Sequence, residues 1–135
     1  MSRNTVLIVE PDTTSRSALR ATLEGDGYTV VEAAGASAAL ALVNQKEITL
    51  VVTELYLASG TQRCLLPAIR SSSALRRTKV LAYTTHSAKK DRDWAIAEGA
   101  DGYVLKKNGQ GRLLQVAANL GRSRRRKRIK RLPEA

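Results

Sequence analysis

The chain has 135 residues, which is enough for one domain with a substantial hydrophobic core and too few for two. It has one cysteine, Cys64, so an intrachain disulfide is excluded, and no apolar run approaches the roughly 18 residues of a membrane span. The first apolar run, Val6–Val9, is too short for a signal peptide and ends in acid. We therefore expect a protein of a reducing cytoplasm, with Cys64 as a small buried apolar group.

Most of the positive charge lies at the C-terminus. Residues 122–135 hold eight Lys or Arg and one Glu, which is +7 of the formal net charge of +11. The basic residues are Arg122, Arg124, Arg125, Arg126, Lys127, Arg128, Lys130 and Arg131. Such a run repels itself, so beyond a domain of residues 1–121 we expect a helix extension or a disordered tail. Guanidinium groups bind phosphate through paired donors, which favours nucleic acid as the partner. An anionic membrane, an acidic protein or a role in solubility alone are the alternatives.

Five short apolar runs predict five strands. They are Thr5–Val9, Tyr28–Glu32, Ile48–Glu54, Val80–Thr84 and Tyr103–Lys106. The runs show little polar alternation, which is typical of strands covered on both faces, as in parallel sheets. Helical patterns separate them, so the sequence predicts an α/β fold with a doubly wound parallel sheet.

The helical patterns indicate caps and core residues. A hydroxyl residue, Thr13, Thr14 or Ser15, is expected to cap the first helix, and Pro67 either begins a short helix or kinks a longer one. The inward positions are expected to be Leu19 and Leu23 on the first helix, Leu40 and Val43 on an Ala-rich helix from Ser37, Trp94 and Ala97 on a charged helix from about Ala88 to Glu98, and Leu113, Ala117 and Leu120 on the last helix.

Three of the predicted strands end at a charged residue. Glu10 follows the first strand, Glu54 ends the third and Lys106 ends the fifth. In open α/β sheets ligands collect at the carboxyl ends of the strands, so these three residues are site candidates. His86, the single histidine, lies in a Ser/Thr-rich loop after the fourth strand, and we expect a solvated residue rather than a metal ligand.

Four blocks along the chain resemble the landmark blocks of response-regulator receiver domains. They are Leu7–Glu10, Leu50–Glu54, Val80–Thr84 and Gly99–Lys106, and the last reads Gly-Ala-Asp-Gly-Tyr-Val-Leu-Lys. Their order and spacing agree with the family over about residues 4–121. The resemblance implies a (βα)5 flavodoxin-like receiver fold with strand order 2-1-3-4-5, in a bacterial cytoplasmic protein of two-component signal transduction.

The resemblance also implies roles for individual residues. In the family, an acidic pair after the first strand and an aspartate ending the third strand hold Mg²⁺, and that aspartate accepts a phosphoryl group. Thr84 matches the hydroxyl residue that grips the phosphate, Lys106 the lysine that does so, and Tyr103 the aromatic that reports the switch. Glu10 fills the first acidic position, and Glu54 stands in place of the phosphoacceptor aspartate.

The acidic half departs from the family pattern. Pro11 falls where the second acid belongs, and Glu54 is one methylene longer than aspartate. Because Mg²⁺ demands tight octahedral geometry from oxygen ligands, we expect the metal site to be lost, with no phosphotransfer and no enzymatic activity. Asp12, one position late, could partly replace the missing acid, which leaves a divalent site of Glu10, Asp12 and Glu54 as a minor alternative. The chain is thus expected to be an atypical pseudo-receiver.

Two interpretations of Glu54 stay open. Its longer side chain pushes the carboxylate toward Thr84 and Lys106, where phosphate oxygens would lie, and so imitates the phosphorylated state. The other interpretation is an inert strut that only neutralises Lys106 and holds the loops apart.

The resemblance implies an output surface on the charged helix, the fifth strand and the last helix. This face carries Lys89, Lys90, Arg92, Lys107 and Arg112. Trp94 on the same face is either a surface anchor or, as we favour, a core residue. Because the tail follows the last helix, we expect body and tail to present one basic surface to a protein partner or a polyanion. The predicted function is a stand-alone, phosphorylation-independent binding module.

Three other functions are compatible with the sequence. One is an ordinary phosphoacceptor that tolerates Glu54 with a divergent Mg²⁺ site. Another is a nucleic-acid-binding protein that uses the fold as a scaffold. The third is a flavodoxin-like FMN binder with its phosphate at Thr13–Ser15, although the later loops lack the paired aromatics that an isoalloxazine would favour.

Overall fold

A computed structural model describes residues 5–45, 47–57, 65–72 and 75–121. The expectations for Cys64 and for the basic tail fall outside these residues. Within them, no helix is both long enough and apolar enough to cross a membrane.

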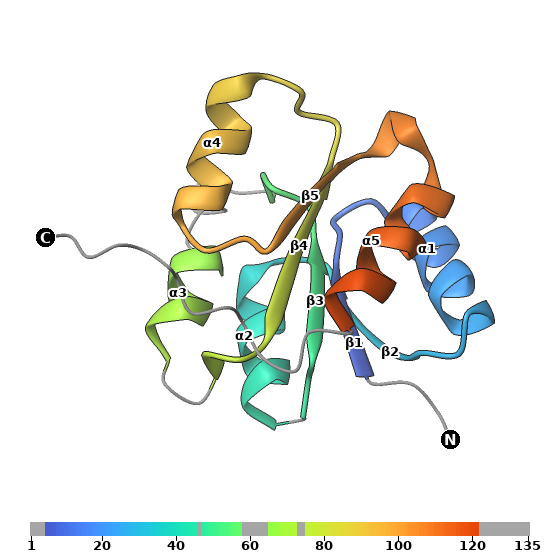
Figure 1. Ribbon diagram of the computed structural model, residues 1–135. Coiled ribbons are helices and arrows are strands. Elements are labelled where there is room, and N and C mark those ends of the chain that lie inside the picture. Colours follow the sequence, from blue (N-terminus) through green and yellow to red (C-terminus); the bar gives the residue numbers. More distant parts are fainter. Residues whose placement is uncertain (1–4, 46, 58–64, 73–74, 122–135) are drawn as a thin grey trace, which may run out of the picture.

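A five-stranded parallel sheet forms the centre of the molecule (Figure 1). Its strands are β1 (Thr5–Val9), β2 (Thr29–Ala33), β3 (Leu50–Thr53), β4 (Lys79–Thr84) and β5 (Gly102–Leu105). They are hydrogen-bonded in the order β2-β1-β3-β4-β5, as the sequence predicts. In the register of the central strands, Leu7 lies beside Val51, which lies beside Val80.

Helices cover both faces of the sheet and connect its strands. They are α1 (Thr13–Gly25), α2 (Ala36–Gln45), α3 (Leu65–Ser71), α4 (Lys89–Ala97) and α5 (Gln110–Gly121), with a short 3-10 turn η3 (Lys106–Asn108) before the last. One core cluster joins the sheet to α2, α3 and α4, and the other joins it to α1 and α5. Every residue of β3 and β4 is buried, because both of their faces are covered.

Two details of the helices differ from the sequence prediction. Asp12 caps α1, since its Oδ2 accepts a hydrogen bond of 2.8 Å from the Ser15 amide, and the hydroxyl residues after it lie inside the helix. On α4 the buried small residue is Ala95, and Ala97 is exposed. Ala95 and Ala97 are two residues apart and so lie about 200° apart around the helix, which means that only one of them can face the core.

Two other ambiguities are resolved. Pro67 lies in the first turn of the seven-residue helix α3, where its missing N–H interrupts no helical hydrogen bond. Trp94 is half-buried and packs against the core cluster that includes α2 and α3, as the core interpretation predicts.

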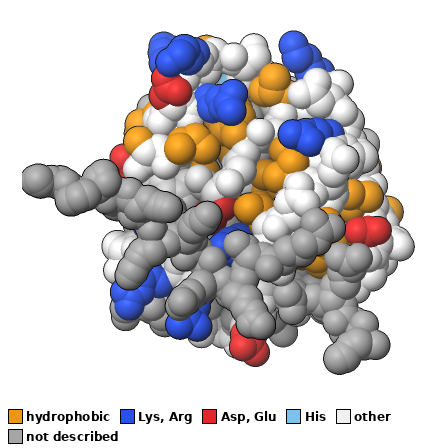
Figure 2. All heavy atoms as spheres, in the orientation of Figure 1, with side chains coloured by type: hydrophobic (Ala, Val, Ile, Leu, Met, Phe, Trp, Pro, Cys, Tyr) orange, Lys and Arg blue, Asp and Glu red, His pale blue; other side chains and the backbone are white. Residues whose placement is uncertain are grey.

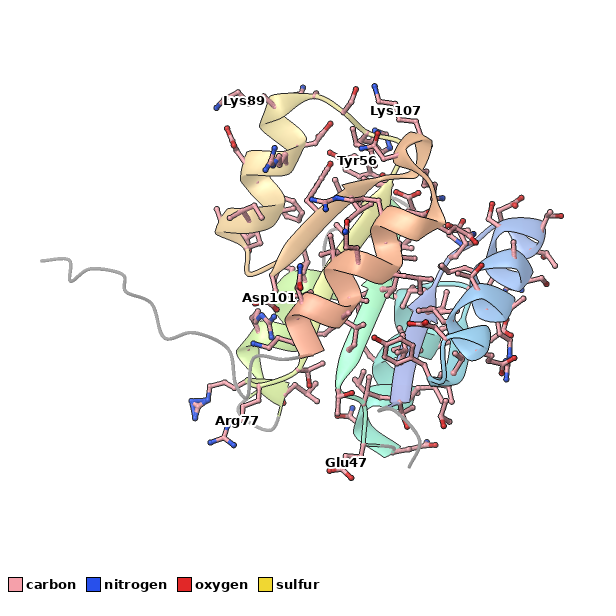
Figure 3. The ribbon with its side chains drawn as sticks, turned by 45° about the vertical axis from the view of Figure 1, so that its right-hand side comes forward. Glu47, Tyr56, Arg77, Lys89, Asp101 and Lys107 are labelled. Atoms are coloured by element: carbon pink, nitrogen blue, oxygen red, sulfur yellow. The ribbon has the colours of Figure 1, made fainter. Side chains whose placement is uncertain are left out.

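All five strands point the same way, so the sheet has a carboxyl edge, where the strands end, and an amino edge, where they begin. Figure 3 shows Lys107 near the carboxyl edge, at the top of the view, and Glu47 and Arg77 at the opposite, amino edge. The charged residues that follow β1, β3 and β5 all lie at the carboxyl edge.

Candidate functional site

A cluster of three charged side chains lies at the carboxyl edge. Strand pairing sets Val9 beside Thr53, so the residues that follow them, Glu10 and Glu54, lie next to each other. Lys106 Nζ lies 2.7 Å from Glu10 Oε1 and 3.0 Å from Glu54 Oε1. The side chains of Glu10, Glu54 and Lys106 are 6%, 11% and 23% exposed. One ammonium therefore bridges two largely buried carboxylates, and the cluster keeps a net negative charge.

The second carboxylate oxygen of Glu54 is also bound. Oε2 accepts a hydrogen bond from the Thr84 hydroxyl and another, of 2.7 Å, from the Leu55 amide. The Glu54 amide in turn donates to the Val9 carbonyl at 2.9 Å. Thr84 is completely buried at the end of β4, so its hydroxyl is aimed into the site by a rigid strand.

Glu10 is held by the loop between β1 and α1. Its Oε2 accepts a hydrogen bond of 3.0 Å from the Asp12 amide, and its carbonyl accepts one of 2.8 Å from Arg16. Arg16 also pairs with Glu32 of β2, at 2.9 Å. Arg16 thus positions the loop that carries Glu10, a role that sequence reasoning missed because its partners lie on two different segments, the β1–α1 loop and β2.

The charge state of Lys106 follows from these contacts. Burial alone would lower the pKa of the ammonium, but the hydrogen bonds to Glu10 and Glu54 outweigh it and raise the pKa above its ordinary value. Lys106 is therefore protonated at neutral pH.

Two tyrosines tie the site to α4. The Tyr56 hydroxyl, in the loop after β3, donates to Oδ1 of Asp91, a buried carboxylate in the first turn of α4. The Tyr103 hydroxyl donates to the His86 carbonyl at 2.8 Å. Burial first, and then the negative charge of Asp91, raise the pKa of Tyr103 to about 12. The two hydrogen bonds hold the segment that connects β4 to α4, one near its start at His86 and the other at its end at Asp91.

His86 differs from its expectation as a solvated loop residue. It is half-buried, and its ring meets the Tyr56 ring edge-on, with centroids 4.4 Å apart and an interplanar angle of 85°. Tyr56, Asp91 and His86 form one contact group that no sequence motif indicated, since Tyr56 and Asp91 are 35 positions apart.

A family model described as the response regulator receiver domain matches residues 6–118. The chain belongs to this family. It is 33% identical over 108 residues to the KDP operon transcriptional regulatory protein KdpE of Escherichia coli (strain K12), a match that covers 80% of this chain. The chain spans about half the length of that relative, 47%.

Solved receiver structures share the fold. The chemotaxis response regulator CheY4 of Vibrio cholerae superposes with a TM-score of 0.81 at 24% identity, over 88% of this chain and 99% of that one. The receiver domain of a sensor histidine kinase from Pseudomonas aeruginosa PAO1, described with a magnesium ion coordinated in its active site cleft, gives 0.79 at 20% identity, over 91% of this chain and 100% of that one. The chain is accordingly a receiver domain of two-component signalling.

The receiver's acidic residues do not fit the family's Mg²⁺. The Asp12 carboxylate is exposed and caps α1, and its bond to the Ser15 amide is the main cause that lowers its pKa. This bond occupies the Ser15 amide at the N-terminus of α1, where the FMN alternative would place a phosphate. Glu10 and Glu54 are both engaged by Lys106. Among the described residues, no group of three or more His, Cys, Asp or Glu could hold a metal ion.

The face of α4, β5 and α5 carries exposed basic side chains beside apolar ones. Figure 2 shows Lys and Arg side chains interspersed with hydrophobic side chains in the upper half of this view. The exposed basic residues of this face are Lys89, Lys90, Arg92, Lys107 and Arg112. Ile96 on α4 is 47% exposed, which is unusual for a large apolar side chain in this molecule. The receiver thus presents a mixed basic and apolar surface next to the segment that the two tyrosines hold.

Proposed function

We propose that this receiver domain acts without phosphotransfer, as a binding module whose pocket is held in a phosphate-like state by Glu54. One observation carries the proposal. A single carboxylate contacts both the Thr84 hydroxyl and the Lys106 ammonium, which are the groups that the family resemblance assigns to gripping a phosphoryl group. Glu54 thereby supplies negative charge to the partners that phosphorylation would otherwise engage.

The same geometry argues against phosphoryl transfer. Transfer needs a metal to neutralise the donor's charge, and the metal needs open oxygen ligands in octahedral array. Here the ammonium of Lys106 takes one oxygen of each glutamate, and Asp12 is committed to the helix cap. We therefore propose that the protein holds no Mg²⁺, is not an enzyme and is a pseudo-receiver.

The proposed output surface is the face of α4, β5 and α5. Glu54 leads through the short loop to Tyr56, and Tyr56 binds Asp91 on α4. The same helix exposes Lys89, Lys90 and Ile96. A protein partner with acidic groups around an apolar patch would match this surface.

The basic tail is the proposed contact to nucleic acid. Eight Lys or Arg lie among residues 122–131, and Ile129 is the single apolar residue between them, so membrane insertion has little support. KdpE is named a transcriptional regulatory protein, which favours DNA as the polyanion. The alternative that the receiver fold serves only as a scaffold for nucleic-acid binding predicts that changes at Glu54 leave all output unchanged.

The decisive variant is Glu54→Gln, with Glu47→Gln as the matched control. Both remove one negative charge, but Glu47 is exposed at the amino edge (Figure 3). We expect amide hydrogen exchange of residues 84–97 to rise in Glu54→Gln and to stay unchanged in the control, because the Lys106 and Thr84 contacts weaken. Equal exchange in the two variants would favour the other interpretation, in which Glu54 only neutralises Lys106 and holds the loops apart.

Phosphorylation is tested directly. The chain is incubated with acetyl phosphate and Mg²⁺, and its intact mass is measured beside that of the Glu54→Gln variant. We expect neither protein to gain a phosphoryl group. A gain by the wild-type chain that Glu54→Gln abolishes would show that Glu54 is a phosphoacceptor, and would overturn the proposal.

A further inference from the structure

The side chain of Arg16, near the start of α1, reaches three groups at once. Its Nε pairs with Glu32 Oε1 at 2.9 Å, and its Nη1 donates to the Glu10 carbonyl at 2.8 Å and to the Pro11 carbonyl at 3.4 Å. Only 18% of the side chain is exposed. The forked guanidinium thus ties the backbone of the β1–α1 loop to β2, the strand at one end of the sheet (Figure 1).

The β1–α1 loop needs such a restraint because one acid of the loop remains to face the pocket. Pro11 stands at the family's second acidic position, and the Asp12 carboxylate caps α1, which leaves Glu10 in contact with Lys106. Under the proposed function the pocket holds no Mg²⁺, so the chain itself has to order the loop.

Glu10 passes the restraint on to the pocket. Its Oε1 lies 2.7 Å from Lys106 Nζ, which in turn lies 3.0 Å from Glu54 Oε1. Lysine carries its charge on a flexible four-carbon stem, so a second anchor limits the positions that the ammonium takes. The bonds from Arg16 go to backbone carbonyls of the loop, and its effect on Lys106 therefore runs through the position of Glu10.

We propose that Arg16 is the positioning residue of the pocket. By fixing the β1–α1 loop it keeps Glu10 on Lys106, and through Glu10 it keeps the ammonium in contact with Glu54. Glu32 completes the arrangement, since it holds the guanidinium from the side of β2. The inference rests on the proposed function, because the contact that Arg16 preserves is one of the two that define the phosphate-like state.

Arg20 provides a matched control. It lies one turn further along α1 and pairs with the other oxygen of Glu32, at 2.6 Å. It also bonds Glu24 at 2.9 Å and the Val30 carbonyl at 3.3 Å, groups that lie outside the β1–α1 loop. Arg16→Gln and Arg20→Gln each remove one guanidinium and one bond to Glu32, so a role in fold stability alone would affect the two variants alike.

The experiment follows two signals of the pocket in the isotopically labelled full chain by NMR. The first is the ammonium resonance of Lys106, assigned by its absence from Lys106→Met. An ion-paired ammonium exchanges its protons with water slowly enough to be observed at low temperature, whereas a solvated one exchanges too fast. The second is the hydrogen exchange of the Leu55 amide, which is buried and donates to Glu54 Oε2 at 2.7 Å.

We expect Arg16→Gln to lose the Lys106 ammonium resonance and to raise the exchange rate of the Leu55 amide about tenfold, the factor for losing one hydrogen bond to a charged group. Arg20→Gln is expected to leave both signals as in the wild-type chain. Retention of the resonance in Arg16→Gln, or its loss in both variants, would overturn the inference.

Arg16→Lys provides the same test if the glutamine variant does not fold. Its ammonium keeps the charge but offers one donor atom in place of the two nitrogens that bond Glu32 and the loop, so we expect the same losses, with Arg20→Lys as the control. Failure of the proposed function would give a different result. If Arg16→Gln lost the resonance while Glu54→Gln left the exchange of residues 84–97 unchanged, Arg16 would remain the positioning residue of Lys106 and the phosphate-like state would be rejected.

Discussion

Each edge of the sheet contains a largely buried ion cluster, and the two clusters are built differently. At the amino edge, Arg70 pairs with one carboxylate, Asp101, at 2.6 Å, and their side chains are 13% and 10% exposed. Arg70 also donates to the carbonyls of Gly99 at 3.0 Å and Thr78 at 2.6 Å. At the carboxyl edge, Lys106 faces two carboxylates.

The difference distinguishes a structural cluster from the one that we propose to be functional. Beyond the pairing of Arg70 with Asp101, the amino-edge bonds go to backbone groups in and before β4 and before β5, so this cluster fixes the fold. The carboxyl-edge cluster keeps an excess negative charge beside solvent. Besides accepting from the Asp12 and Leu55 amides, it joins the side chains that follow β1 and β3 to Thr84 of β4 and Lys106 of η3. An unbalanced cluster of this kind responds to a change in any one member.

The largest effect is expected from Asp101→Asn at the amino edge. The amide keeps the shape of the side chain but leaves the Arg70 guanidinium without its counter-charge in a largely buried place. Breaking such a pair lowers the free energy of unfolding by about 3 kcal/mol. Urea denaturation near neutral pH measures it. The control is Asp93→Asn in the exposed pair with Lys89, for which we expect at most about 0.5 kcal/mol. Equal losses in the two variants would remove the structural role assigned to the amino-edge cluster.

Lys106→Met is expected to have a smaller effect. Without the ammonium, Glu10 and Glu54 face each other as two carboxylates, which lowers the free energy of unfolding by about 2 kcal/mol near neutral pH. Neutralising one of the two as well, in Lys106→Met/Glu10→Gln, removes the repulsion, so part of the stability returns. Urea denaturation of the single and the double variant near neutral pH measures it. A loss as large in the double variant as in Lys106→Met would contradict the carboxylate repulsion.

Tyr56→Phe tests the link between the carboxyl edge and α4. The variant keeps the ring against His86 but deletes the hydroxyl that donates to the buried Asp91 carboxylate. A hydrogen bond to a charged group contributes about 1.5 kcal/mol, and we expect faster amide exchange in α4. Tyr83→Phe is the control, since the Tyr83 hydroxyl makes no hydrogen bond within the described residues. If Tyr83→Phe loosened α4 to the same extent, the Asp91 contact would not be the link.

Sequence reasoning located the carboxyl-edge cluster because strand ends can be derived from local patterns. Apolar runs place Glu10, Glu54 and Lys106 at the ends of parallel strands, and parallel strands end together. No such rule finds the amino-edge pair. Arg70 and Asp101 are 31 positions apart, and they meet only because α3 packs against the α4–β5 loop.

The same limit applies to the tyrosine contacts. Tyr103 was found through the family block, but Tyr56 and Asp91 carry no motif. A charged residue in the first turn of a surface helix reads as solvent-exposed, and Asp91 is buried because the loop after β3 covers it. Which polar side chains are buried depends on the packing of loops, and periodicity in the sequence does not describe loops.

The smallest predicted effect concerns Tyr103 at alkaline pH. The unfolded chain releases the phenolic proton near pH 10, whereas burial raises the pKa of folded Tyr103 to about 12. Between those values the folded state holds more protons than the unfolded state, so the free energy of unfolding falls as pH rises. The pKa of Lys106 is also raised, so Lys106 adds a further fall in the free energy of unfolding at pH values above its ordinary pKa.

In Tyr103→Phe the fall caused by Tyr103 disappears and the fall caused by Lys106 remains. Because Tyr103 is partly exposed, solvent screening limits the difference between wild type and variant to less than about 1 kcal/mol. Urea denaturation at about pH 9 and about pH 11 measures it. Parallel losses of stability in the two proteins would mean that Tyr103 ionises in the folded chain as it does in water, and that its bond to the His86 carbonyl does not hold the loop.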